Sequence, residues 1–193
     1  MERLTTERYF EEALALLGEQ GSQALTIAAM CERLDVTKGS FYHHFSGMPA
    51  FCDELLAYWE REHSDRLIAL SLAESDSSLR ITSITEMAVT LPHASESAIR
   101  AWGRSSPDVA AVVERVDQHR ERHVVESLEA LGLPPERARI FARLALDLLI
   151  GIQTREVPPS PTRARELLQE IERIVFVEAD PELLARVRER AGR

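Results

Sequence analysis

Apolar side chains recur every three or four positions along almost the whole chain, and this spacing is the strongest constraint on its fold. A period near 3.6 residues places such side chains on one face of an α-helix. No segment shows the alternation of apolar and polar residues that is typical of strands, and prolines and short polar runs separate the helical segments. The sequence therefore predicts an all-α protein with helices at about 5–18, 26–34, 37–44, 49–72, 79–91, 94–104, 107–131, 135–155, 163–177 and 181–191.

Two short helices near the N-terminus are expected to be joined by a tight turn. Gly18 and Gly21 are expected to end the first helix as C-caps do. Thr26 and Thr37 are placed to cap the second and third helices through their hydroxyl groups. Helix starts of this kind present free backbone amides that can bind phosphate.

The third predicted helix has two contrasting faces. On a helical wheel Phe41 and Phe45 share one side, which we expect to face inward. His43 points directly away from them, with Gly39 beside it one turn earlier. The flanking positions are polar: they are Ser40, Tyr42 and, through its long stem, Lys38. An eight-residue helix is about 12 Å long, which suits the width of the DNA major groove, so we infer that this outward face meets double-stranded DNA.

The charge of the chain requires any such binding to be local. The formal net charge is −9, which argues against broad attachment to nucleic acid or to an anionic membrane. The first 46 residues carry four cationic and seven acidic side chains, and Lys38 is the only lysine of the chain. Taken singly, each residue has an ordinary alternative: the threonines as caps alone, Tyr42 as a partly buried core residue, and the paired histidines as solvated surface.

Residues 5–58, and especially LTIAAMCERLDVTKGSFYHHF at 25–45, closely resemble the helix-turn-helix domain of the TetR (tetracycline-repressor-type) transcriptional regulators. The resemblance implies a DNA-binding domain at 1–47 (motif 26–45), a ligand-binding and dimerisation domain at 48–193, and a homodimeric repressor. The positions that match DNA-contacting positions of the family are Thr26, Thr37, Lys38, Ser40, Tyr42 and His43, and His44 also falls in the motif. Gly39 joins this set because it allows close approach of the backbone.

The start of the fourth predicted helix departs from the family pattern. Members usually begin the fourth helix with Lys-Glu, whereas this chain has Met48-Pro49. The change removes a phosphate contact, so we expect binding that is weak, salt-sensitive or dependent on both protomers of a dimer.

In the body, the resemblance implies a small-molecule pocket and two late helices that pair across a two-fold axis. Met87 and Trp102 are predicted pocket walls because such sites are lined by flexible and aromatic apolar groups, with ordinary core positions as the alternative. Two segments are more apolar than one buried face of a monomer needs, and we interpret them as a dimer interface, with internal packing as the alternative. The predicted interface residues are Leu144, Leu148, Ile152, Leu167, Ile171, Ile174 and Val175.

Other functions find little support in the sequence. No nucleophile with a base, Gly-rich phosphate loop or HExxH pattern is present, so we predict neither an enzyme nor a cofactor. His119 and His123 have the spacing of a metal pair, but the arginines around them favour a charged helix face. Cys31 and Cys52 are interpreted as free thiols. No apolar run is long enough for a membrane span, and we expect a cytoplasmic protein.

The sequence thus predicts a ligand-responsive transcriptional regulator. It is expected to be a homodimeric repressor that inserts its third helix into a near-palindromic DNA operator and is released by a small-molecule effector. An activator would differ only in operator placement. The alternative of another class is a helical sensor or protein-binding module that retains the fold without useful DNA affinity, and it is motivated by Met48 and the acidic N-terminal unit.

Overall fold

Helices follow one another throughout the computed structural model, which describes residues 5–155 and 159–180. The α-helices are α1 Thr6–Gln20, α2 Ile27–Leu34, α3 Lys38–His44, α4 Met48–Glu60, α5 Arg66–Leu72, α6 Ser77–Thr90, α7 His93–Gly103, α8 Pro107–Leu131, α9 Pro135–Arg155 and α10 Pro161–Ala179. A 3₁₀ turn spans Ser22–Ala24, and a π-helical segment spans Arg61–Asp65. Strands are absent from these ranges, which confirms the all-α prediction. The helix predicted at 181–191 lies outside the described residues.

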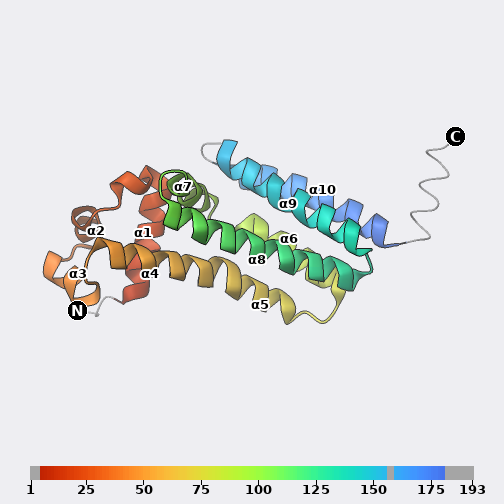
Figure 1. The fold of residues 1–193 in the computed structure, drawn as a ribbon, viewed down its shortest axis with the longest axis horizontal. Helices are drawn as coiled ribbons and strands as arrows, with labels where there is room; N and C mark the ends of the chain where they lie inside the picture. Colours follow the sequence, from red (N-terminus) through yellow and green to blue (C-terminus); the bar gives the residue numbers. More distant parts are fainter. Residues whose placement is uncertain (1–4, 156–158, 181–193) are drawn as a thin grey trace.

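The first three helices form one end of an elongated molecule (Figure 1). Their core is a cluster of aromatic rings, and the side chains of Phe41 and Phe45 are 0% and 2% exposed within it. The ring of Phe45 lies 4.8 Å from that of Phe51 on α4, in an edge-to-face arrangement. The two phenylalanines predicted to face inward therefore anchor α3 to α4.

Gly18 has a role that differs from the predicted one. It lies inside α1, and Gly21 alone occupies the C-cap position, with a φ of 78°. A Cβ atom at Gly18 would lie 3.1 Å from both the Cβ atom of Ala94 and the backbone nitrogen of Ser95. The prediction that Gly18 ends the helix is wrong, because this glycine instead lets α7 pack closely against α1.

The long helix predicted at 49–72 is interrupted. It consists of α4, the π-helical segment Arg61–Asp65 and α5. A π-helical turn inserts an extra residue without ending the helix, and such turns are frequent at functional sites. The apolar periodicity therefore predicted the extent of the rod correctly and missed the change of register within it.

The body packs around the central helix α8. Figure 1 shows α9 and α10 side by side along one long edge of the molecule, with α4 and α5 on the opposite edge. Helices α6 and α7 complete the body, and buried aliphatic side chains fill its interior. Within the described part of the chain, no helix has the length and apolar character needed to cross a bilayer.

Candidate functional site

The turn between α2 and α3 is held by local hydrogen bonds. The backbone N–H of Ala29 donates to Oγ1 of Thr26 at 3.1 Å, and that of Ser40 donates to Oγ1 of Thr37 at 3.3 Å. Both threonines therefore act as the predicted N-caps. Asp35 occupies the left-handed region with a φ of 52°, which reverses the chain between the two helices.

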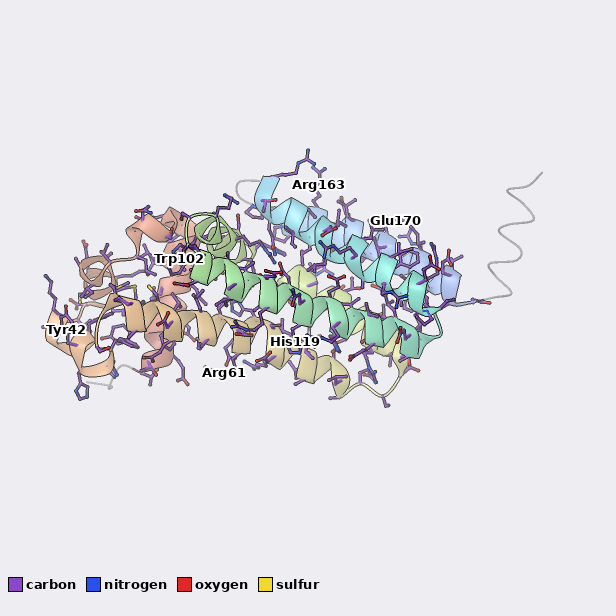
Figure 2. All side chains as sticks on the ribbon, viewed as in Figure 1. Tyr42, Arg61, Trp102, His119, Arg163 and Glu170 are labelled. Carbon is purple, nitrogen blue, oxygen red and sulfur yellow. The ribbon has the colours of Figure 1, made fainter. Side chains whose placement is uncertain are left out.

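The outward face of α3 is open. Lys38, Gly39, Tyr42 and His43 are exposed, and the exposed fraction of Tyr42 is 56%. A Cβ atom at Gly39 would meet only Oγ1 of Thr37, at 3.5 Å, so the backbone is accessible from outside. Figure 2 shows Tyr42 at the end of the molecule, projecting away from the body. The predicted exposure of this face is therefore confirmed.

Two other predicted contact residues are turned partly toward the core. Ser40 is half-buried, and its Oγ lies 3.1 Å from the hydroxyl oxygen of Tyr9 on α1. His44 is also half-buried, with its ring centroid 5.4 Å from that of Tyr9. Tyr9 is a supporting residue that sequence reasoning missed, because periodicity does not reveal a contact between residues 31 positions apart.

The positive charge at the start of α3 comes from a single side chain, Lys38. Arg33 pairs with Glu12 and Glu19, and both distances are 2.7 Å. The hydrogen bond from Arg33 lowers the pKa of Glu19 below its ordinary value. Arg8 also pairs with acidic neighbours on α1. Between residues 5 and 47, Lys38 is thus the one Lys or Arg side chain outside an ion pair.

A second site lies within the body. A cavity of about 140 Å³, partly open to solvent, lies between the π-helical segment and helices α5, α6, α8, α9 and α10. Most of its wall is aliphatic, and Met87 lines it as predicted. Trp102 does not; it borders a more open hollow between α4 and α8, near the junction of α7 and α8 (Figure 2). The two predicted wall residues are therefore not brought together.

One end of the cavity is polar and rests on a buried ion pair. The carboxylate of Glu96, which is 0% exposed, accepts hydrogen bonds from Nε1 of Trp59 at 2.6 Å and from Arg120 at 2.9 Å. Burial raises the pKa of Glu96, but the charge of Arg120 and these hydrogen bonds outweigh that effect and hold it well below its usual range. Arg120 also donates to the backbone oxygen of His63 at 2.8 Å, so it ties the π-helical segment to α7 and α8.

Two buried polar atoms in residues 5–155 and 159–180 lack a hydrogen-bond partner: Nδ1 of His63 and Oγ of Ser64. Both residues belong to the π-helical segment, and both line the cavity. Nδ1 of His63 lies 3.5 Å from Oε1 of Glu96, which is too long for a strong hydrogen bond. Ser64 is 1% exposed and has no such neighbour. No sequence pattern pointed to this pair, because the segment has the pattern of a charged helix surface.

The histidine pair considered as a metal site is separated by the fold. His119 lies on the surface with Nδ1 3.3 Å from Asp65. His123 is buried at the cavity, where its Nε2 lies 2.6 Å from Oγ of Ser71 and where burial lowers its pKa below the ordinary value. The described residues contain no cluster suited to a metal ion.

The predicted dimer residues divide into two groups. Leu144 on α9 and Ile174 on α10 are 49% and 44% exposed. Ile152 and Val175, at 5% and 2%, are buried inside the protomer. The remaining three are half-buried: Leu148, Leu167 and Ile171. An apolar outer surface is therefore present, but it is narrower than the predicted set.

An exposed, capped helix at one end and an apolar cavity at the other define a helix-turn-helix DNA-binding regulator with a separate helical body. Residues 10–55 match the family of bacterial regulatory proteins, tetR family. Similar solved structures include a transcriptional regulator from Aquifex aeolicus VF5 (TM-score 0.71, 18% identity, 89% of this chain and 99% of that one). A TetR-family regulator from Streptomyces coelicolor has a TM-score of 0.71 and 17% identity, covering 90% of this chain and 89% of that one. The fatty acid degradation regulator FadR from Bacillus halodurans has a TM-score of 0.68 and 12% identity, covering 89% and 94%.

No protein with a curated description matches the chain. The match over residues 10–55 places the N-terminal domain in the TetR family, and the fold of the chain is similar to that of solved TetR-family regulators. Proteins of this family are regulators and not enzymes, in agreement with the sequence prediction.

Proposed function

We propose that this protein is a cytoplasmic homodimeric repressor that binds a near-palindromic operator and is released by a small-molecule effector. The exposed face of α3 carries the proposal. Its Phe41 and Phe45 are fixed in the core, so Lys38, Gly39, Tyr42 and His43 are presented on a rigid rod that fits the major groove. Thr26, Thr37, Ser40 and His44 would support the contact with DNA from the flanks of this face.

The proposal assigns a separate role to each of the two domains. Residues 1–47 would bind DNA, and residues 48–193 would dimerise and bind the effector. The exposed side chains of Leu144 and Ile174 support a dimer through the outer surface of α9 and α10, because a pair of such surfaces buried against each other removes apolar area from water.

A continuous rod supports a route from the effector site to the DNA. Helix α4 packs against α3 through Phe51, and its π-helical continuation borders the cavity with His63 and Ser64. A molecule in the cavity that binds one arrangement of this rod better than another would shift the population of dimer geometries. Release follows if the favoured geometry no longer spaces two α3 helices about 34–36 Å apart.

The test is fluorescence anisotropy with DNA from the regions upstream of the protein's own gene and its neighbours. At low salt we expect tighter binding to a near-palindromic fragment than to random DNA of equal length. His43→Ala should change the preference among operator variants, whereas Tyr42→Phe should weaken binding to all sequences alike. Equal losses of the His43 variant on operator and random DNA would contradict the proposed reading role of His43.

A second candidate is a helical sensor or protein-binding module without useful DNA affinity. Two observations favour it: α4 begins with Met48 and no side-chain cap, and the arginines of α1 and α2 are held in ion pairs. Absence of any retained DNA at low salt, with and without candidate effectors, would support this candidate over the repressor.

A further inference from the structure

The polar end of the body cavity has the character of an unfilled binding position. Ser64 lines the cavity, and its Oγ is buried without a hydrogen-bond partner. Native proteins pair most of their buried polar groups, because an unpaired one costs stability. The π-helical segment that carries Ser64 is itself a departure from regular helix of the kind found at functional sites. A hydroxyl held in this way is available to a ligand.

The size of the cavity limits what it can hold. Its volume of about 140 Å³ is close to that of an engineered apolar cavity of about 150 Å³ that binds benzene. A single aromatic ring, or about six to nine non-hydrogen atoms, fills such a space. The aliphatic wall, including Met87, Leu149 and Leu168, suits an apolar molecule.

Two of the three Arg and Glu side chains that line the cavity are already held in ion pairs. Arg120 is neutralised by Glu96 at 2.9 Å, and Glu121 pairs with Arg143 at 3.0 Å. Glu172, which is half-buried, accepts a hydrogen bond from Thr82 at 2.6 Å.

His123 contacts Ser71 at 2.6 Å, and burial lowers its pKa, which favours the neutral ring. An anionic ligand would therefore be buried without a counter-charge, which is costly. A cationic ligand would have only the half-buried carboxylate of Glu172, which already accepts a hydrogen bond from Thr82.

We propose that the cavity binds an uncharged, mainly apolar molecule about the size of one aromatic ring, with a single hydrogen-bonding group placed on Oγ of Ser64. The inference rests on the proposed function, since it specifies the effector class of the repressor. Ser64 is a positioning contact, and the aliphatic wall supplies most of the affinity. Nδ1 of His63 is turned instead toward the carboxylate of Glu96, at 3.5 Å, so Ser64 is the polar contact that the proposal uses.

The experiment is isothermal titration calorimetry of the full chain, without DNA, against four probes of similar shape: toluene, benzyl alcohol, benzoate and benzylammonium. We expect the two uncharged probes to bind and benzoate to bind at least about 10-fold more weakly, because the anion would lose its hydration without gaining a partner. Benzylammonium would meet only the Glu172 carboxylate and should also bind more weakly than benzyl alcohol. Tighter binding of benzoate or benzylammonium than of benzyl alcohol would overturn the proposed class. Failure of all four probes to bind would overturn the cavity as a site for molecules of this size.

The hydroxyl contact is isolated by comparing two probes in two variants. Ser64→Ala should lower the affinity for benzyl alcohol about 3- to 10-fold, which is the range of one net hydrogen bond. Its affinity for toluene should stay within about 2-fold of the wild-type value. The variant removes an unpaired group, so it should fold. Ser127→Ala is the matched control, because this buried serine does not line the cavity and its hydroxyl already donates to the backbone oxygen of His123 at 2.8 Å. This control variant should change the affinities for benzyl alcohol and toluene by the same factor.

If Ser64→Ala lowers the affinities for benzyl alcohol and toluene equally, the proposed hydrogen bond to Oγ of Ser64 is overturned. The outcome is separable from the proposed repressor function. Selective benzyl alcohol binding that leaves DNA binding unchanged would support the ligand class and count against effector release. Release of DNA by a charged molecule bound in the cavity would do the reverse.

Discussion

Removing the negative charge of Glu96 is expected to destabilise the protein strongly. Glu96→Gln keeps nearly the same shape but leaves Arg120, whose side chain is 12% exposed, buried beside a neutral group. Loss of one partner of a buried ion pair costs about 3–5 kcal/mol. For a chain of this length each kcal/mol lowers Tm by about 2–4 °C, so the expected loss is about 6–20 °C. The measurement is thermal and urea unfolding followed by circular dichroism at 222 nm, at one protein concentration.

A matched control is an exposed ion pair formed by another arginine of α8. Glu60 pairs with Arg115 at 2.6 Å, but the Arg115 side chain is 57% exposed. Glu60→Gln should therefore cost no more than about 1 kcal/mol, the usual range for a surface pair. The double variant Glu96→Leu with Arg120→Leu should regain much of the lost stability, because no unpaired charge remains. If Glu96→Gln costs no more than Glu60→Gln, the reasoning about the buried pair is refuted.

The same pair has a pH signature. The pKa of Glu96 is lower in the folded protein than its ordinary value of 4.5, so the unfolded state takes up the proton first as pH falls. The stabilisation is therefore fully present above about pH 4.5 and declines as pH falls below it toward the folded pKa. The stability difference between wild type and Glu96→Gln should be constant from pH 6 to 8 and should narrow below pH 4.5.

Three further outcomes are expected. Lys38→Ala should reduce the slope of log K against log salt concentration by about 1 per protomer; an unchanged slope would exclude a phosphate contact. Asp35→Ala should lower Tm by about 1–4 °C, because alanine is less suited to a φ of 52°, whereas Asp35→Gly should not lower it. Gly18→Ala should cost about 1–3 kcal/mol despite a better helix propensity, because its Cβ would lie 3.1 Å from Ser95. A gain in Tm from Gly18→Ala would show that α1 and α7 separate without cost.

The DNA-binding end was largely predictable because its determinants are local in sequence. The caps at Thr26 and Thr37 act on amides three residues away, and the wheel that placed Gly39 outward and Phe41 inward needs only a helical period. The lengths of most helices followed from prolines and polar breaks for the same reason. Periodicity cannot report a contact between distant segments, so the hydrogen bond of Ser40 to Tyr9 was not foreseen.

The body shows where sequence reasoning ends. Trp59 and Glu96 meet across 37 residues, and Arg120 reaches the backbone of His63 across 57. The cavity is a space left between several helices, so no single residue pattern encodes it. Of the two predicted wall residues, Met87 lines the cavity and Trp102 does not. The sequence by itself determined the helices, their inward faces and the DNA-binding motif, because these depend on neighbours within one or two turns. Only tertiary packing decided the buried ion pair, the π-helical segment and the unpaired hydroxyl of Ser64, because each depends on which distant helix lies opposite.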